Sequence, residues 1–257
     1  KITCLNTDLA TVQAVLWLNP DPPPPPPPPP PSIIPPLPAP PGAPNSGQIT
    51  PGGSSYSVAS GSYVYMVDDS RVGELFPSGV TTLTNAGTIY LEDVPGSPAA
   101  LSLVTATAFD QPTIDSFTNS GTLVVHAVYG NTGAYGIFDH SPYGNISTDV
   151  ANSGQIFCVS KAGTACAVLT EKWNSSVINS GLIAVQADLG PAIGIDLVHG
   201  GTINNQAGGQ ILVSGSGNYG AYTIDGIFGS PAIGVLIEGS AFPDDGSNPV
   251  ELTNAGL

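Results

Sequence analysis

TNSGTLVVHA at residues 118–127 is one copy of a motif that recurs along the chain. Its core is an Asn, then Ser or Ala, then Gly, followed by alternating apolar residues. The other copies are TNAGTIYLED (84–93), ANSGQIFCVS (151–160), INSGLIAVQA (178–187), NQAGGQILVS (205–214) and TNAGL (253–257), and NSGQI (45–49) resembles an earlier, degenerate copy. The asparagines from Asn85 to Asn205 are 34, 33, 27 and 26 residues apart. The next step, to Asn254, is 49 residues, which fits a double-length turn or one turn with an insertion. Repeats of this length predict a solenoid.

Each copy predicts a short β-strand with one apolar face. Alternation places every second residue on the same side of a strand, and the residues predicted to share that side are Ile89, Leu91, Leu123, Val125, Ile156, Cys158, Ile183 and Val185. One repeat cannot bury such a face alone, whereas coils stacked about 4.8 Å apart bury a continuous apolar column. Only 9% of the residues are charged and 32 are Gly. Small and β-branched residues favour closely stacked strands, so the predicted fold class is all-β.

The Asn-Gly step of each copy predicts a corner between strands. Asn tolerates left-handed backbone geometry, and the following Gly allows a positive φ without steric cost. Asparagines at equivalent corners would also stack as a ladder down the axis and satisfy each other's amides. The predicted ladder is Asn85, Asn119, Asn152, Asn179, Asn205 and Asn254.

A second motif lies between these copies. Its members are NTGAYGIFD (131–139), GTACAVL (163–169), GPAIGIDL (190–197), GNYGAYTID (217–225) and GSPAIGVLIE (229–238). A third short strand precedes each corner, as in SSVI (175–178) and PVEL (249–252). Each repeat therefore predicts three short strands joined by turns.

These recurring corners and Gly-Ala-x-Gly-Ile strands resemble the right-handed parallel β-helix of bacterial autotransporter passengers and related secreted adhesins. The resemblance covers roughly residues 84–257 and is less clear over 45–83. It implies a parallel β-helix at the cell surface or outside the cell. An antiparallel β-sandwich is the alternative architecture.

The chain divides into three predicted segments. Residues 1–18 form an apolar arm, residues 19–44 a proline-rich linker, and residues 45–257 the β-helix domain. Proline fixes φ and lacks an N–H donor, so the linker is predicted to be polyproline II. Ten consecutive prolines at 22–31 then make a stiff rod of roughly 30 Å at about 3.1 Å per residue.

Charge and hydropathy exclude several classes of partner. Four Lys and Arg against nineteen Asp and Glu give a net charge of −15, which repels nucleic acid and anionic lipid. After residue 44 the only cations are Arg71, Lys161 and Lys172. No apolar run approaches the roughly 20 residues that span a bilayer. We therefore expect that the chain neither binds nucleic acid nor spans a membrane. The acidic residues are expected to keep the chain soluble or to give it a diffuse affinity for calcium.

Three cysteines leave two interpretations open. Cys158 and Cys166 are eight residues apart, which suits a local disulfide in an oxidising compartment or two buried small apolar side chains. Cys4 is left over, either free or cross-linked to another chain. Asn145 and Asn174 begin formal glycosylation sequons, which matter only in a cell that glycosylates its surface proteins.

The sequence predicts no enzyme, cofactor or metal site. Among β-helix proteins, polygalacturonases carry paired carboxylates as acid and base within Asn-Thr-Asp, Asp-Asp, Gly-His-Gly and Arg-Ile-Lys signatures. Asn6-Thr7-Asp8 lies before the proline run, Asp68-Asp69 and Asp244-Asp245 lie far apart with His199-Gly200 between them, and Arg-Ile-Lys is absent. The histidines, at 126, 140 and 199, form no HxH or HxxxH pair.

Two non-enzymatic functions remain. In the first, the solenoid is a self-assembling extracellular filament subunit, because TNAGL ends inside a motif with no polar cap. The arm, through Ile2, Cys4 and Leu5, would then complete the open coil around Leu252, Asn254, Gly256 and Leu257 of a neighbour. In the second, the chain is a fragment of a monomeric adhesin that presents its loops at 94–100, 140–148 and 239–249 to a host or surface polymer. A polysaccharide-acting enzyme is the least favoured hypothesis.

Overall fold

The computed structural model describes residues 34–46, 49, 53–68, 74–76, 80–95, 100–106, 114–129, 133–139, 147–215, 232–237 and 250–255. The chain divides into two compact units, Lys1–Pro31 and Ser32–Leu257. All described residues belong to the second unit, and the following account concerns that unit alone.

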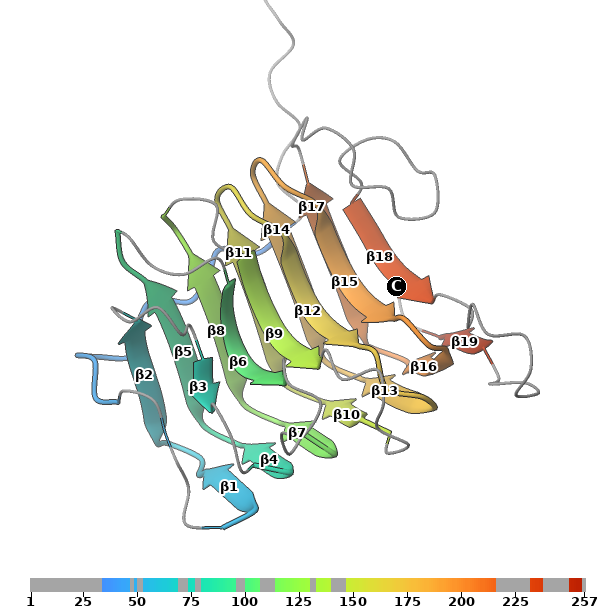
Figure 1. Cartoon of the computed structure of the whole chain (residues 1–257), viewed down its shortest axis with the longest axis horizontal. Helices are drawn as coiled ribbons and strands as arrows, with labels where there is room; N and C mark the ends of the chain where they lie inside the picture. The colour runs from blue at the N-terminus through green and yellow to red at the C-terminus, as the bar shows by residue number, and fades with distance from the viewer. Residues whose placement is uncertain are drawn as a thin grey trace, which may run out of the picture. The chain divides into compact units, whose positions relative to one another are not determined.

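Within the described residues the regular structure consists of β-strands in three sheets (Figure 1). Sheet A contains β2 (Tyr63–Asp68), β5 (Thr88–Asp93), β8 (Thr122–Ala127), β11 (Gln155–Ser160), β14 (Leu182–Ala187) and β17 (Gln210–Gly215). Sheet B contains β1 (Ser55–Val58), β4 (Thr82–Asn85), β7 (Ser116–Asn119), β10 (Asp149–Asn152), β13 (Ser175–Asn179), β16 (Gly201–Asn205) and β19 (Val250–Asn254). Sheet C contains β3 (Glu74–Phe76), β6 (Ala100–Ala106), β9 (Gly133–Asp139), β12 (Ala165–Thr170), β15 (Ala192–Leu197) and β18 (Ala232–Ile237).

The chain visits sheets B, A and C in turn, and every strand pairs in parallel with the strand one circuit later. This is the β-solenoid that the repeats predict, with three strands in each coil, and it excludes an antiparallel sandwich for the described residues. Six complete coils are followed by β19, the first strand of a seventh. Because β19 pairs directly with β16, the 49-residue step is one turn with longer connections.

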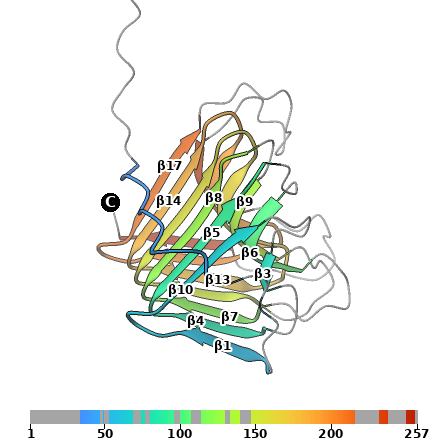
Figure 2. The same ribbon diagram turned by 90° about the vertical axis from the view of Figure 1, so that its left-hand side faces the viewer.

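The strands of the three sheets stack along one axis (Figure 2), and a continuous apolar cluster fills the interior. All eight residues predicted to share the inner face are in this core, and each is fully buried. In register they form two columns in sheet A, one running through Ile89 and Ile183 and the other through Leu91 and Val185. Burial of such side chains stabilises a fold by roughly 1.5–3 kcal/mol each relative to exposure. The repeat pattern thus predicted the core correctly.

The second motif bends the strands of sheet C. Ala165 and Val168 of β12 both belong to the interior cluster, although they are three residues apart. The register continues in step on either side of this bend, with Ala165 opposite Ala192 and Val168 opposite Ile195. In a regular strand successive side chains point to opposite faces, so two residues three positions apart cannot share a face. The regular alternation is therefore interrupted between Ala165 and Val168, where a small residue lies. The spacing Ala-x-Gly-Ile therefore supplies two core residues per strand.

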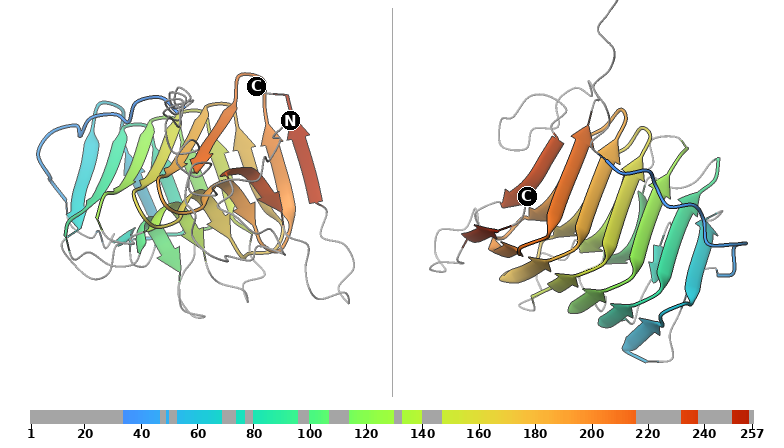
Figure 3. Two further views of the ribbon diagram at one scale, coloured as in Figure 1. Left: turned by 90° about the horizontal axis from the view of Figure 1, so that it is seen from above. Right: turned by 180° about the vertical axis from the view of Figure 1, so that it is seen from behind.

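Residues 34–44, here called the strap, cross the outer face of sheet A (Figure 3, right). Ile34 is 8% exposed, and it clusters with the outward side chains Tyr65, Tyr90, Val124, Phe157 and Ala184. Leu37 packs on the same cluster. The strap covers an apolar stripe that would otherwise face solvent. Residues 19–33 of the predicted linker lie outside the described residues.

Candidate functional site: the open C-terminal coil

The last coil exposes residues that belong to the core. Leu252 of β19 lies opposite Ile203 of β16, in the column that contains Leu83, Phe117, Val150 and Val177. Those five partners in the column are at most 2% exposed, whereas Leu252 is 53% exposed. An apolar side chain of this size loses contact area because no further strand packs on it among the described residues.

Sheets A and C end at the same place. β17 and β18 are their last strands among the described residues. Ile211 and Val213 of β17 are only half-buried, although the equivalent Ile183 and Val185 one coil earlier are fully buried. A hollow of about 220 Å³ opens here, lined by Asn205, Ile211, Gly234, Val235, Leu252 and Asn254. Among the described residues the coil thus presents an apolar hollow beside the edge strands of sheets A and C.

The opposite end of the solenoid has a covering segment. The backbone N–H groups of Asn45 and Ser46 donate to the Tyr65 carbonyl, at 3.0 and 3.1 Å. Asn45 Oδ1 accepts the Tyr65 N–H at 2.8 Å, and the Ile49 N–H donates to the Leu75 carbonyl at 2.7 Å. NSGQI is therefore no corner of the repeat, because Ser46 pairs with Met66 in the middle of β2. The corner position of the first coil is Val58, opposite Asn85.

The six corner asparagines form a hydrogen-bonded row along the axis. In each step Nδ2 of one asparagine donates to Oδ1 of the next at 2.7–2.9 Å, from Asn85 through Asn119, Asn152, Asn179 and Asn205 to Asn254. Nδ2 of the first four also donates to the carbonyl of the first sheet A residue of the next coil, as Asn152 does to Leu182 at 3.2 Å, whereas Nδ2 of Asn205 donates to the Gly209 carbonyl at 3.1 Å. The first five side chains are at most 3% exposed, so their amides are satisfied by each other and by backbone.

At four of the corners the reason for glycine differs from the predicted one. Gly208, in the NQAGG copy, has the predicted positive φ, at 87°, whereas Gly87, Gly121, Gly154 and Gly181 at the earlier corners do not. A Cβ on Gly154 would instead lie 2.1 Å from the carbonyl oxygen of Gly121. The corner glycines stack so closely that a methyl group has no room, and this contact between coils selects glycine.

The two repeat-domain cysteines are free thiols, so the disulfide that was one interpretation of their spacing is not formed. Cys158 points into the core from β11, and Cys166 lies on β12 with its Sγ donating to the Val168 carbonyl at 3.3 Å. Burial raises the pKa of both thiols. The second interpretation, two buried small side chains, describes them. Cys4, Ile2, Leu5, Gly256 and Leu257 lie outside the described residues.

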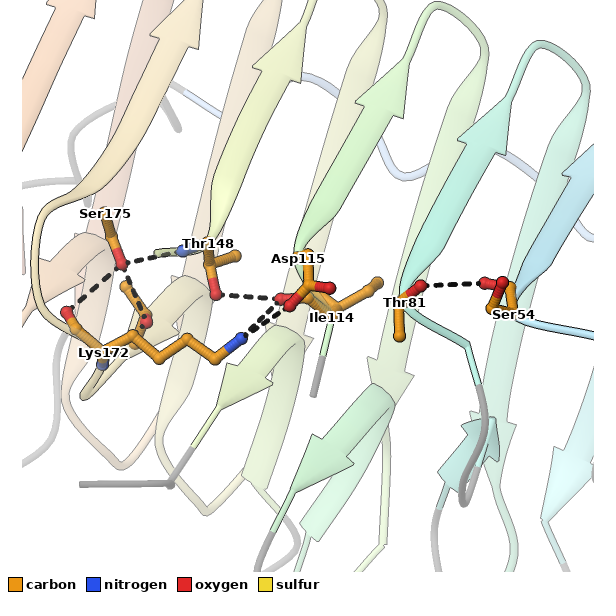
Figure 4. A network of polar contacts seen from close by, with 8 residues as sticks. Ser54, Thr81, Ile114, Asp115, Thr148, Lys172 and Ser175 are labelled. Atoms are coloured by element: carbon orange, nitrogen blue, oxygen red, sulfur yellow. Dashed lines mark hydrogen bonds and ion pairs between the residues drawn. The ribbon is translucent and has the colours of Figure 1, made fainter. Parts of the chain in front are cut away.

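Lys172 is fully buried at the entrance to β13 (Figure 4). Its Nζ donates to the Ile114 carbonyl at 3.0 Å and lies 3.4 Å from Asp115 Oδ1. Thr148 Oγ1 donates to the same carbonyl at 3.0 Å, and the Thr148 N–H donates to Ser175 Oγ at 3.2 Å. The Lys172 ammonium group thus connects segments that belong to different coils. Nothing in the sequence motif predicted this contact, which spans 58 residues.

A second polar group lies beside the strap on sheet A. Tyr65 Oη donates to Glu92 Oε2 at 2.7 Å, and His126 Nδ1 is 3.6 Å from Glu92 Oε1. Burial, together with the bond to Glu92, raises the pKa of Tyr65 to about 12, and burial and Glu92 raise the pKa of Tyr90 to about 12. Burial lowers the pKa of His126 against the opposing effect of Glu92 and Asp93. These contacts join side chains of successive coils.

The remaining candidates for chemistry are dispersed. His199 stacks on Trp173 with ring centroids 4.7 Å apart, and Lys161 is exposed at the end of β11. Arg71, His140 and the pair at 244–245 lie outside the described residues. No three His, Cys, Asp or Glu side chains gather as a metal site in the part of the chain that the structure describes. No helix there is long and apolar enough to cross a membrane.

The outward stripe under the strap was missed from the sequence, although a signal for it exists. Copies such as TIYL, TLVV, QIFC and LIAV place an apolar residue between the two inward ones. An apolar residue at the same outward position of successive strands indicates that a second layer covers that stripe of the sheet.

Comparison with known proteins identifies no relative: no protein-family model, no curated protein and no solved structure matches the chain.

Proposed function

We propose that this chain is a non-enzymatic structural protein of the extracellular surface, and that its open C-terminal coil joins copies head to tail into a filament. The observation that carries the proposal is the exposure of Leu252 at a core position, 53% against at most 2% for its partners. An apolar hollow beside two strand edges is a surface on which another strand or another copy can pack.

The composition supports a structural role. Only 9% of the residues are charged, and the buried asparagine amides form hydrogen bonds between stacked coils. The right-handed, autotransporter-like form of the coil, its extracellular location and the absence of enzymatic activity are parts of the same proposal. An adhesin that displays its outward loops is the alternative, and most residues of those loops lie outside the described residues.

Negative-stain electron microscopy and multi-angle light scattering of the full chain test the proposal. We expect filaments or a concentration-dependent rise in mass, increased by salt because the copies are acidic. Leu252→Asp should abolish the assembly. Leu189→Asp is the matched control, because Leu189 is equally exposed at 51% but lies in the turn after β14. A wild-type chain that stays monomeric at every concentration, or equal loss in both variants, refutes the proposal.

A further inference from the structure

We infer that residues 1–17 of this chain carry the two strands that follow β19 in the seventh coil, and that they dock on β17 and β18 in the register of the other coils. The inference rests on the open coil of the proposed function and names the segment that fills it.

The first strand is residues 1–6, KITCLN, which match β11, QIFCVS, position by position. Ile2 takes the position of Ile156, and Cys4 takes that of Cys158, both of them core residues. In register with β17, Ile2 then lies beside Ile211 and Cys4 beside Val213. Lys1 and Leu5 fall on the outer face.

The second strand is residues 12–17, VQAVLW, which match β12, ACAVLT. Ala14-Val15-Leu16 repeats Ala167-Val168-Leu169, and it reproduces the small residue at the bend of sheet C. Val15 then takes the core column of Val168, Ile195 and Val235. Val12 takes the column of Ala165 and Ala192.

The spacing of the two strands also agrees. Five residues, 7–11, separate Asn6 from Val12. Four residues separate β11 from β12, and five separate β8 from β9. The arm therefore has the length of chain that passes from sheet A to sheet C in the described coils. A coincidental apolar segment has no reason to match both strands and the turn between them.

Docking in this register would cover the apolar residues that are exposed in the last coil. Two strands would cover Ile211, Val213 and Val235 and fill the hollow beside Leu252. The corner asparagines from Asn85 to Asn179 each donate to the carbonyl of the first sheet A residue in the next coil, as Asn179 does to Gln210 at 3.3 Å. For Asn205 of the sixth coil the equivalent acceptor is the carbonyl of Lys1.

The ten prolines at 22–31 favour the arm of a neighbouring copy over the chain's own arm. Ten residues of polyproline II span roughly 30 Å, whereas adjacent strands are about 4.8 Å apart. We therefore assign the arm that docks on β17 and β18 to a second copy of the chain.

A disulfide between Cys4 and an introduced cysteine tests the register. Cα atoms of adjacent strands, about 4.8 Å apart, lie within the range of about 4.4–6.8 Å that a disulfide spans. We expect Val213→Cys to cross-link with Cys4 under mild oxidation, seen on non-reducing gels and by peptide mapping. Ser214→Cys is the matched control, because residue 214 points to the opposite face. Adding Cys4→Ser should remove the cross-link.

The outcomes separate the two proposals. A ladder of disulfide-linked chains supports both the strand register and the filament. A bond within one chain between Cys4 and the cysteine introduced at position 213, or a species that stops at two chains, supports the register and refutes the filament. No cross-link at position 213, or an equal one at position 214, overturns the inference, and filaments that persist by microscopy then leave the proposed function standing.

A second variant pair gives an independent measurement. Val15→Asp places a carboxylate in the predicted core column, whereas Leu16→Asp places it in the column of Leu169 and Asp196, which already holds a carboxylate. We expect loss of hydrogen-exchange protection at the amides of β18 in the first variant only. Equal protection in both variants counts against the docking of residues 12–17 on β18.

Discussion

Asn152→Ala tests whether the row of asparagines holds the coils together. Asn152 is buried, and its Nδ2 donates to Asn179 Oδ1 at 2.7 Å and to the Leu182 carbonyl at 3.2 Å. The substitution removes both bonds and also the bond that Asn152 Oδ1 accepts from Asn119 Nδ2 at 2.8 Å, so two acceptors lose this donor and one buried donor loses its acceptor. A buried group left unsatisfied costs about 1–3 kcal/mol, so the free energy of unfolding should fall by about 2–4 kcal/mol.

The matched control is Asn254→Ala, at the exposed end of the same row. Asn254 accepts one bond, from Asn205 Nδ2 at 2.9 Å, and its side chain is exposed. Water can replace that bond, so the expected loss is at most about 1 kcal/mol. Urea unfolding followed by far-ultraviolet circular dichroism measures both, and hydrogen exchange at β10 and β13 reports the local effect. Equal destabilisation by the two substitutions refutes the reasoning.

Other contacts of the fold give four further predictions. Gly154→Ala should destabilise the fold by about 1–3 kcal/mol, because its Cβ would meet the Gly121 carbonyl at 2.1 Å, whereas Gly53→Ala, with open space around it, should be neutral by thermal unfolding. The pKa values of Tyr65 and Tyr90 are raised to about 12 in the folded state, so the folded state holds these protons more tightly than the unfolded state does. Their contribution to stability is therefore complete below pH 10 and is lost between pH 10 and about 12. In alkaline denaturation, a Tyr65→Phe, Tyr90→Phe double variant should lose stability less steeply with pH than the wild type. Cys158 and Cys166 should resist a thiol reagent in the folded protein and react in urea, and mass spectrometry that finds either one labelled in the native state would contradict their burial. Ile34→Asp should release the strap and expose the stripe on sheet A, detected as increased binding of a hydrophobic dye, while Pro41→Ser, at an exposed strap position, should leave dye binding unchanged.

The repeats predicted the strands, the interior columns and the register because each has a signature in residue order. An apolar residue at every second position fixes which side of a strand is buried, as for Ile156 and Cys158. A recurring Asn fixes which residues are neighbours between coils, as for Asn119 and Asn152. Parallel stacking preserves both signals along the chain.

The features that could not be predicted from the sequence depend on contacts between segments that are distant in the chain. Lys172 reaches the Ile114 carbonyl because the turn before β13 places it there, and no other coil has an equivalent lysine. Ile34 packs on sheet A although its own segment has no strand pattern. The corner glycines were predicted, but for a positive φ that Gly208 adopts and that Gly87, Gly121, Gly154 and Gly181 do not. Their actual cause, an approach of 2.1 Å to the carbonyl of the coil before, appears only when coils are stacked.

The row of asparagines also has a direction, since every amide donates toward the C-terminal end. If two copies met through their C-terminal ends, the amide donors of the two rows would face each other. The row therefore distinguishes a head-to-tail array from one in which neighbouring copies point in opposite directions. In the parallel sense the row would meet Val58, the corner residue of the first coil, which has no side-chain acceptor. The chain of amides is therefore interrupted once per body. In any end-to-end array under tension, we expect these interruptions, and not the coils within a body, to be where the array breaks.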